Sequence, residues 1–465
     1  MSGTGGPDAT IRGWAVDPDA GREGAAEVEV RDGVLERLTW LSSPDADGIT
    51  PDGTLILPGL IDLHAHFREP GNEDAETVAT GLAAAAHGGF TTVALMPNTT
   101  PALDEPSVLG RIRAAAAGSG SPIRVLAHGA VTTGRKGETL SAMGELADAG
   151  VVGFSDDGAP VRSATILRNA LAYAGALGVP IVDHPEDLAL TEGAEASEGY
   201  VATVLGLKGW PVAGEAGSVA RSIAVLADVV RDVPGARLHL THLSTASSLD
   251  HVRAAKAAGL PVTCDVTPHH LALADEWIAG ARRWAWEALD ADGRARDPWS
   301  DGALVAGPYD PSLRVNPPLR SAEDAAACRA ALRDGTADAI ATDHAPHTEV
   351  DKHVEFGWAV NGISGIETAL SVVLAAVAAG ELPLATAVAQ LTTGPARVLG
   401  ARGGVAPGLR AGQPADLVVV DAGAAWTVEA ASLASKGKNT PLLGRALPAV
   451  VRLVLANGTL AYARD

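Results

Sequence analysis

Residues 60–71 read LIDLHAHFREPG, a short apolar run that ends in two histidines two positions apart. In a β-strand, alternate side chains project from the same face, so His64 and His66 can reach one common point. Paired imidazoles are good ligands for a metal such as zinc. Taken alone, the pair is equally compatible with two interior histidines that only form hydrogen bonds, so the rest of the chain must decide.

The sequence around this stretch repeats one pattern. Short β-branched or apolar runs alternate with longer alanine-rich amphipathic segments, which is typical of repeated βα units. Eight parallel strands in succession favour a closed (β/α)8 barrel of the TIM type. The predicted strands are 60–66, 90–96, 123–130, 151–155, 179–184, 237–242, 261–266 and 338–342, and the clearest predicted helices are 74–86, 163–176, 218–230, 245–258 and 322–332.

The two ends of the chain have a different texture. Strand-like runs at 28–40 and 54–57 precede the barrel, and others at 416–420, 426–428 and 451–462 follow it. Asn457-Gly458 is a hairpin signal. We expect both termini to meet in one small β-sandwich, with domain limits at 1–58 for its N-terminal part, 59–391 for the barrel and 392–465 for its C-terminal part. Residues 281–314 interrupt the alternation of strands and helices before the eighth strand. We expect a long loop or lid there, and the sequence does not indicate its role.

Composition excludes several classes of protein. With 47% hydrophobic and 20% charged residues over 465 positions, the chain can bury a large core and is not disordered. Its 35 basic and 56 acidic residues give a net charge of −21, which disfavours nucleic acid and anionic membranes as partners. Two cysteines, no secretory pattern in residues 1–17 and no apolar stretch long enough for a bilayer predict a cytoplasmic protein.

Further histidines and aspartates stand where predicted strands end. Asp157 follows the fourth strand, His184 ends the fifth, His242 ends the sixth and Asp343 follows the eighth. In a barrel these ends lie on the face where active sites are assembled. With His64 and His66 they make six ligands, whose burial without a cation would be costly.

Six ligands favour two metals over one. One zinc that keeps a position open for water cannot accept them all, whereas two metals bridged by a carboxylate can. The imidazole-rich set favours zinc, with manganese or cobalt as substitutes. Such a centre activates water and polarises a carbonyl, so amide or ester hydrolysis is the expected chemistry.

Seven motifs together resemble dihydroorotases of the amidohydrolase superfamily, in their longer bacterial class I type. They are DLHAHFREPG (62–71), MPNT (96–99), GFSDDG (153–158), THLS (241–244), NPPLR (316–320), ATDHAPH (341–347) and SKGKNTP (435–441). The resemblance implies a metal-dependent hydrolase that reversibly cyclises N-carbamoyl-L-aspartate to L-dihydroorotate and water in pyrimidine (UMP) biosynthesis. It also implies two Zn²⁺ per subunit, a homo-oligomer and an association with aspartate transcarbamoylase.

The bridge between the metals is expected to be an aspartate. Similar enzymes use a carboxylated lysine there, but none of the six lysines of this chain ends the fourth strand. Asp156 and Asp157 are both available and point to opposite sides if the strand continues. Spacing to His184 in similar enzymes favours Asp157, bridging together with a hydroxide, and leaves Asp156 a supporting or capping role.

The substrate contacts implied by the resemblance surround this centre. Arg68 follows the histidine pair closely, and its planar fork suits a carboxylate; in isolation it would instead be read as a surface arginine paired with Glu69 or Glu73. Asp343 is the expected proton shuttle. The other implied contacts are His66, Asn98, Asn316, His347, Asn361 and Gly362.

Two residues depart from the family pattern, Phe67 in place of leucine and Pro185 in place of a small residue.

Two other functions are alternatives to this one. A related cyclic amidohydrolase, acting on dihydropyrimidines, hydantoins or allantoin, would keep the metals but has no need of Arg68 and usually carries the lysine bridge. A non-catalytic scaffold would be expected to have lost metal ligands, and all six are present.

Overall fold

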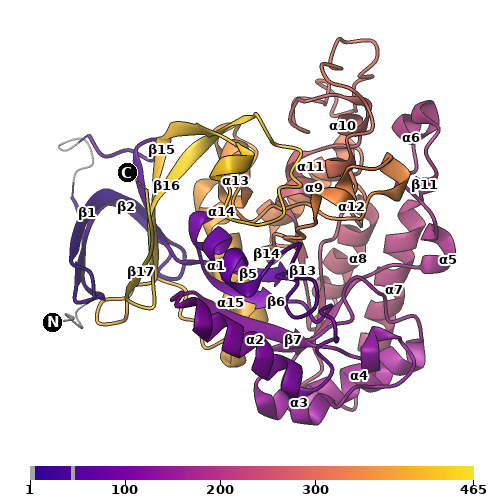
Figure 1. Cartoon of the computed structure of the whole chain (residues 1–465), viewed down its shortest axis with the longest axis horizontal. Helices are drawn as coiled ribbons and strands as arrows, with labels where there is room; N and C mark the ends of the chain where they lie inside the picture. The colour runs from indigo at the N-terminus through magenta and orange to yellow at the C-terminus, as the bar shows by residue number, and fades with distance from the viewer. Residues whose placement is uncertain (1–5, 43–47, 465) are drawn as a thin grey trace.

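The computed structural model describes residues 6–42 and 48–464. Eight parallel strands form one sheet in the order β14-β13-β12-β9-β8-β7-β6-β5. Its edges meet where Ala65 pairs with His344 and the His66 N–H donates to the His344 carbonyl at 2.9 Å. The predicted (β/α)8 barrel is therefore confirmed (Figure 1). Its strands are β5 (Leu60–Ala65), β6 (Phe90–Leu95), β7 (Arg124–Gly129), β8 (Gly153–Phe154), β9 (Ile181–Asp183), β12 (Leu238–Leu240), β13 (Val262–Val266) and β14 (Ala339–Ile340).

Helices cover the outside of this sheet, and two of them begin elsewhere than predicted. α1 starts at Val78 instead of 74 because Thr77 caps it, accepting a hydrogen bond from Thr80 N. α7 starts at Val212, directly after Pro211, and not at 218. The main helices are α1 (Val78–His87), α2 (Pro106–Ser119), α3 (Met143–Ala149), α4 (Ala164–Leu177), α7 (Val212–Val229), α8 (Ala246–Ala257), α11 (Ala322–Asp334), α13 (Ala369–Ala378), α14 (Leu384–Leu391) and α15 (Thr393–Leu399).

Shorter elements occupy the connections at the open end of the barrel. They are α5 (Leu188–Thr191), β10 (Ala196–Ser197), α6 (Tyr200–Leu205), β11 (Gly209–Trp210), α9 (Pro268–Ala272), α10 (Glu276–Ala279) and α12 (Glu349–Lys352). Among the described residues, no helix combines the length and apolar content that a bilayer crossing requires.

Both termini contribute to a second sheet of seven strands, in the order β17-β16-β15-β4-β1-β2-β3. Successive side chains of its middle strands point to opposite faces and enter two different cores. Ile56 and Val419 pack into a core with β1 and β2, whereas Leu57 and Val418 belong to the core shared with the barrel. Both faces are covered at residues 55–58 and 417–420, and the sequence there is apolar. The strands are β1 (Ala9–Asp17), β2 (Arg22–Arg31), β3 (Val34–Trp40), β4 (Thr54–Pro58), β15 (Leu417–Thr427), β16 (Ala446–Ala456) and β17 (Thr459–Ala463).

Several terminal strands differ in detail from the prediction. β1 was not predicted, and the two runs at 416–420 and 426–428 are one irregular strand, β15. Asn457 and Gly458 form the predicted hairpin turn between β16 and β17, with φ of 49° and 74°. The segment 281–314 is a long loop as predicted, with a single 3-10 turn at Pro311–Leu313.

The domain limits stay a prediction, and residues 1–5, 43–47 and 465 of the terminal parts lie outside the described residues. One contact bears on the limit at 391. Val398 and Leu399 of α15 pack against Ile61, Leu63 and Ala339 in a buried cluster of barrel-strand residues. α15 therefore belongs spatially with the barrel, although it lies beyond residue 391.

The departure at Phe67 generates a prediction about packing. The buried Phe67 ring lies over α1 at Gly81, where an added Cβ would stand 2.4 Å from the ring. Gly81→Ala should therefore lower stability by about 1–3 kcal/mol through overpacking, offset by about 1 kcal/mol of helix propensity. Thermal unfolding measures the effect. Phe67→Leu/Gly81→Ala should be more stable than Gly81→Ala alone, and a double variant no more stable than the single one would contradict this packing.

Candidate active site

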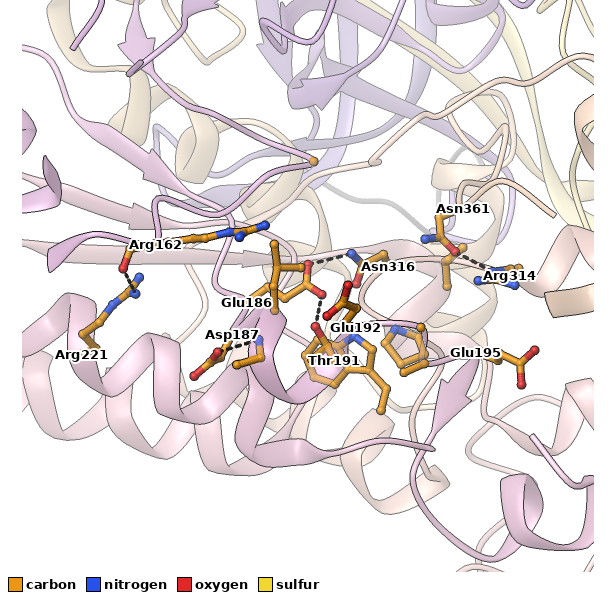
Figure 2. A pocket seen from close by; sticks show the side chains of 18 residues that line it. Arg162, Glu186, Asp187, Thr191, Glu192, Glu195, Arg221, Arg314, Asn316 and Asn361 are labelled. Carbon is orange, nitrogen blue, oxygen red and sulfur yellow. Dashed lines mark hydrogen bonds between the residues drawn. The ribbon is translucent and has the colours of Figure 1, made fainter. Parts of the chain in front are cut away.

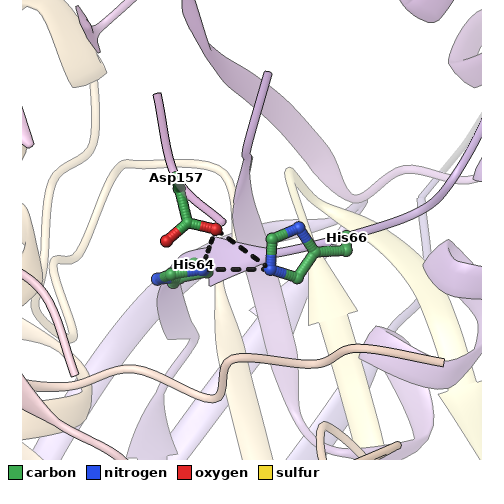
Figure 3. Close-up of side chains that lie close together, drawn as sticks. All are labelled: His64, His66 and Asp157. Carbon is green, nitrogen blue, oxygen red and sulfur yellow. Dashed lines mark hydrogen bonds and ion pairs between the residues drawn. The ribbon is translucent and has the colours of Figure 1, made fainter. Parts of the chain in front are cut away.

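Four ligand atoms gather at the carboxyl ends of β5, β8 and β14. His64 Nε2 and His66 Nε2 are 3.1 Å apart, and Asp157 Oδ2 lies 3.2 and 3.4 Å from them. Asp343 Oδ1 is 3.4 Å from His64 Nε2 and 3.1 Å from His66 Nε2. Figure 3 shows the two imidazoles and the Asp157 carboxylate directed at one another. We call these four side chains the first ligand group.

Three further atoms gather beside it. Asp157 Oδ1 lies 3.4 Å from His184 Nδ1 and 3.3 Å from His242 Nε2, and those two nitrogens are 2.9 Å apart. This second ligand group shares Asp157 with the first, through the other carboxylate oxygen. The structure therefore brings all six predicted ligands together, with Asp157 between two clusters.

Both groups have dimensions that fit a tetrahedral metal. Zinc–nitrogen and zinc–oxygen bonds of about 2.0–2.1 Å place neighbouring tetrahedral ligands about 3.3 Å apart. The observed separations of 2.9–3.4 Å match this spacing. All six side chains are buried. The ligand atoms of His64, His66 and Asp157 lie within 4.8 Å of one another, and so do those of Asp157, His184 and His242. The residues present thus fit a metal site, in which Asp157 is common to both groups of ligands.

Each histidine of the first group is held by a polar neighbour at its other ring nitrogen. Asn98 Oδ1 lies 2.8 Å from His66 Nδ1, and Thr241 Oγ1 lies 2.7 Å from His64 Nδ1. A donated Nδ1–H leaves the Nε2 lone pair free for a metal. Asn98 was predicted to contact substrate; in the structure it contacts His66, a predicted metal ligand.

The buried carboxylate of Asp265 supports both groups. It accepts hydrogen bonds from the His242 N–H at 2.6 Å, from the Thr241 hydroxyl at 3.2 Å and from His239 Nε2 at 2.8 Å. Asp265 holds the backbone of His242 directly. It also holds Thr241, whose hydroxyl oxygen contacts His64. Sequence reasoning missed Asp265, which lies at a strand position with no distinguishing spacing.

Asp156 turns away from the ligands. Its carboxylate accepts hydrogen bonds from the Thr132 N–H at 3.0 Å and from the Thr132 hydroxyl. This placement supports the choice of Asp157 as the bridge and gives Asp156 the supporting role expected for the other aspartate.

Closure of the barrel positions Asp343. Asp62 Oδ1 on β5 accepts from the Thr342 N–H at 2.9 Å, so the end of β14 is tied to the strand that carries the histidine pair. Asp343, His242 and Arg68 all have positive φ, of 45°, 43° and 59°. Such backbone strain in non-glycine residues clusters at functional sites.

The electrostatics of the site call for positive charge. Burial raises the pKa of Asp157 and Asp343, but the neighbouring histidines outweigh it and hold both pKa values below their usual range. Burial lowers the pKa of His64, yet Asp157 and Asp343 raise it to about 9. Buried carboxylates thus draw protons onto the imidazoles, and a divalent cation meets the same demand.

A cavity of about 230 Å³ adjoins the ligands and is lined by all the predicted substrate contacts. Arg68 is held at its edge, with Nε donating to the Pro346 carbonyl at 3.1 Å and Nη2 lying 3.2 Å from His347 Nε2. Burial lowers the Arg68 pKa to about 10, opposed by Asp343 and Asp157, so its guanidinium stays charged at neutral pH.

Asn361 and Gly362 line the cavity, but their polar groups are engaged within the protein. Asn361 Oδ1 accepts from Arg314 Nε at 3.2 Å, and Gly362 N donates to the Arg314 carbonyl at 2.9 Å. Asn439, from the SKGKNTP motif, donates to the carbonyls of Ala345 and Gly362 and accepts from the His347 N–H. This residue of the C-terminal region was not predicted as part of the site, although its motif was recognised.

Comparisons with known proteins agree on the family and the fold. The family model described as Dihydro-orotase-like matches residues 53–248. Dihydroorotase from Anaeromyxobacter dehalogenans (strain 2CP-1) is 45% identical over 455 residues, 97% of each chain, and that from Pelotomaculum thermopropionicum is 44% identical over 448 residues, 96% of each. The structure of L-hydantoinase (dihydropyrimidinase) from Arthrobacter aurescens superposes with a TM-score of 0.75 at 23% identity, covering 97% of this chain and 95% of that one. At that identity the likeness concerns the fold.

The two adjacent aspartates provide a test of the bridge. Asp157→Asn removes a carboxylate shared by both ligand groups and should leave the purified chain, after zinc loading and dialysis, with clearly less than one tightly bound zinc. Asp156→Asn, the matched control, should keep the metal content of the wild type and cost about 1–3 kcal/mol of stability through its bonds to Thr132. Metal analysis and thermal unfolding measure both. Loss of zinc from the Asp156 variant with retention in the Asp157 variant would reverse the assignment.

Proposed function

Since the chain belongs to the dihydroorotase family of cyclic-amide hydrolases, we propose that it interconverts N-carbamoyl-L-aspartate and L-dihydroorotate, with release of water on ring closure. We propose that the reaction depends on zinc and serves pyrimidine (UMP) biosynthesis. The main support for the proposal is the half-buried, charged Arg68, which lies beside two ligand groups in a cavity of substrate size.

Arg68 supplies the selectivity. The chain has a net charge of −21, so an anionic substrate needs a local cation to be held. Arg68 lies at the edge of the cavity with its guanidinium oriented by Pro346 and His347. A guanidinium binds a carboxylate in a planar two-bond arrangement. L-dihydroorotate carries a carboxylate, whereas hydantoin and allantoin do not, so Arg68 favours dihydroorotate over the alternative cyclic amides.

Two zinc ions per subunit are proposed, one for each ligand group, with Asp157 between them. When bound, they supply an activated water and polarise the carbonyl that is attacked. His64, His66 and Asp343 would hold the first, and His184 and His242 the second. The hydrogen bonds that the Nδ1–H groups of His66 and His64 donate to Asn98 and Thr241 keep the Nε2 atoms of the first group available.

Asp343 is the proposed proton carrier. Its Oδ1 lies among the ligands, and its pKa is lowered by His64 and His66 despite burial, so it is ionised at neutral pH. In ring opening it would take the proton lost by water and deliver it to the departing ring nitrogen; in ring closure it would act in reverse. Asn98, Asn316 and His347 would orient the ring, with His66 at its reacting side, and Asn361 and Gly362 would form part of the cavity wall.

Oligomer formation, association with aspartate transcarbamoylase and a cytoplasmic location stay predictions. Exposed apolar side chains around the open end of the barrel, among them Val305, Val350 and Trp358, are the surface that a protein contact would cover. Light scattering of the pure chain, alone and mixed with the transcarbamoylase, measures both associations.

The activity itself is tested with both directions of the reaction. We expect ring closure of N-carbamoyl-L-aspartate at mildly acidic pH and ring opening of L-dihydroorotate at alkaline pH, each abolished by a chelator and restored by zinc. Hydantoin and allantoin serve as neutral controls. Turnover of a neutral ring in preference to dihydroorotate would contradict the proposal, and so would inactivity of the zinc-loaded enzyme.

Arg68 has its own test. Arg68→Met should lower kcat/KM for L-dihydroorotate about 100-fold or more, since a hydrogen bond to a charged group contributes about 1.5–3 kcal/mol and two are lost. Arg68→Lys, which keeps the charge and loses the planar fork, should fall between this variant and the wild type. Steady-state kinetics with unchanged zinc content measures the effect, and a Met variant with wild-type kcat/KM would refute the role.

A further inference from the structure

Glu186 lines a cleft of about 740 Å³ (Figure 2), whose lining shares Asn316 and Asn361 with that of the substrate cavity. It follows the ligand His184 by two residues and lines the cleft, while Asn316 lines both the cleft and the smaller cavity. The sequence motifs and the spacing of the histidines do not predict a role for Glu186. Its contacts connect a metal ligand to a substrate contact.

Three donors converge on the Glu186 carboxylate. Oε2 lies 3.0 Å from His184 Nε2 and 3.0 Å from Asn316 Nδ2, and Oε1 accepts from the Thr191 hydroxyl. The bonds to Asn316 and Thr191 are drawn in Figure 2. An ionised carboxylate can only accept hydrogen bonds, so both of its nitrogen neighbours must present N–H groups.

This requirement decides which way the Asn316 amide faces. With its NH₂ group committed to Glu186, the carbonyl oxygen Oδ1 is on the other side. Asn316 Oδ1 is buried and has no hydrogen-bond partner among the described residues. A buried carbonyl oxygen without a hydrogen-bond partner costs free energy. A bound substrate that donates an N–H to this oxygen would remove that cost. Both ring nitrogens of L-dihydroorotate carry such a hydrogen.

The same requirement decides the tautomer of His184. With Nε2–H donated to Glu186, the lone pair is on Nδ1. His184 Nδ1 is the atom that joins Asp157 and His242 in the second ligand group. A carboxylate on the far nitrogen also makes the imidazole a stronger metal ligand.

We propose that Glu186 is a positioning residue with two effects: it holds His184 in the tautomer that binds the second metal, and it turns the Asn316 carbonyl towards the substrate's N–H. The second effect rests on the proposed dihydroorotase function, and the first does not. Glu186 itself touches neither substrate nor metal.

Three variants distinguish the loss of the Glu186 hydrogen-bond acceptors from the loss of a negative charge in the cleft. Glu186→Met keeps the length of the side chain and removes both acceptors. It should weaken zinc binding at the second ligand group about 10- to 100-fold and raise KM for dihydroorotate about tenfold. Glu186→Gln keeps one oxygen for His184 and Asn316, while the Thr191 hydroxyl can turn to accept from the new amide, so its KM should stay within about threefold of wild type. Glu192→Gln removes the same charge from an exposed side chain of the same cleft and should match wild type.

Zinc titration and steady-state kinetics are the measurements. Wild-type zinc affinity in Glu186→Met overturns the proposal. Equal losses in the Met and Gln variants, or losses in Glu192→Gln, also overturn it, because charge and not acceptor geometry would then be responsible.

A double-variant cycle tests whether the effect on KM passes through Asn316. In an Asn316→Ala background, Glu186→Met should leave KM unchanged while still weakening zinc binding. A further tenfold rise in KM in that background would show another route and overturn the second effect.

The tautomer of His184 can also be measured in the wild-type protein. This test therefore does not require that any variant folds correctly. NMR of the zinc-loaded protein with ¹⁵N-labelled histidine should show His184 protonated at Nε2, and protonation at Nδ1 overturns the first effect. Failure of the proposed function would appear differently, as a zinc-loaded wild type that does not open dihydroorotate.

Discussion

The carboxylate of Asp157 is shared by two sets of ligands, one at each oxygen, and much of the structure serves to hold it there. Its Oδ2 lies beside His64 and His66, and its Oδ1 beside His184 and His242. These side chains come from four different strands, so their convergence requires a closed barrel. The hydrogen bonds from Thr342 to Asp62 and from the His66 N–H to the His344 carbonyl close that barrel at the level of the ligands.

The small terminal sheet also contributes to the site. The segment between β15 and β16 carries Asn439 back to the barrel mouth, where it holds the backbone of Ala345, His347 and Gly362. The loop that presents His347 to the cavity is therefore fixed by the C-terminal region of the chain. This explains in physical terms why the SKGKNTP motif accompanies the histidine motifs, although it supplies no ligand.

Much of the fold and of the ligand set could be predicted because both depend on periodicity. The eight strands alternate with helices, and the ligands stand at strand ends, which meet at one face. β1 was missed because ATIRGWAVD alternates poorly, with a glycine at its centre. Other features depend on side-chain direction, which spacing does not contain. The choice between Asp156 and Asp157 needed the bonds to Thr132, and the roles of Glu186 and Asp265 needed the positions of their donors.

Asp157 is proposed to lie between two metal positions. Anomalous diffraction at the zinc edge, from crystals of the zinc-loaded protein, tests this arrangement. We expect two peaks, one on each side of the Asp157 carboxylate and about 3.5–4 Å apart, as in known two-metal sites. A single peak, or two peaks of which neither adjoins Asp157, would contradict it.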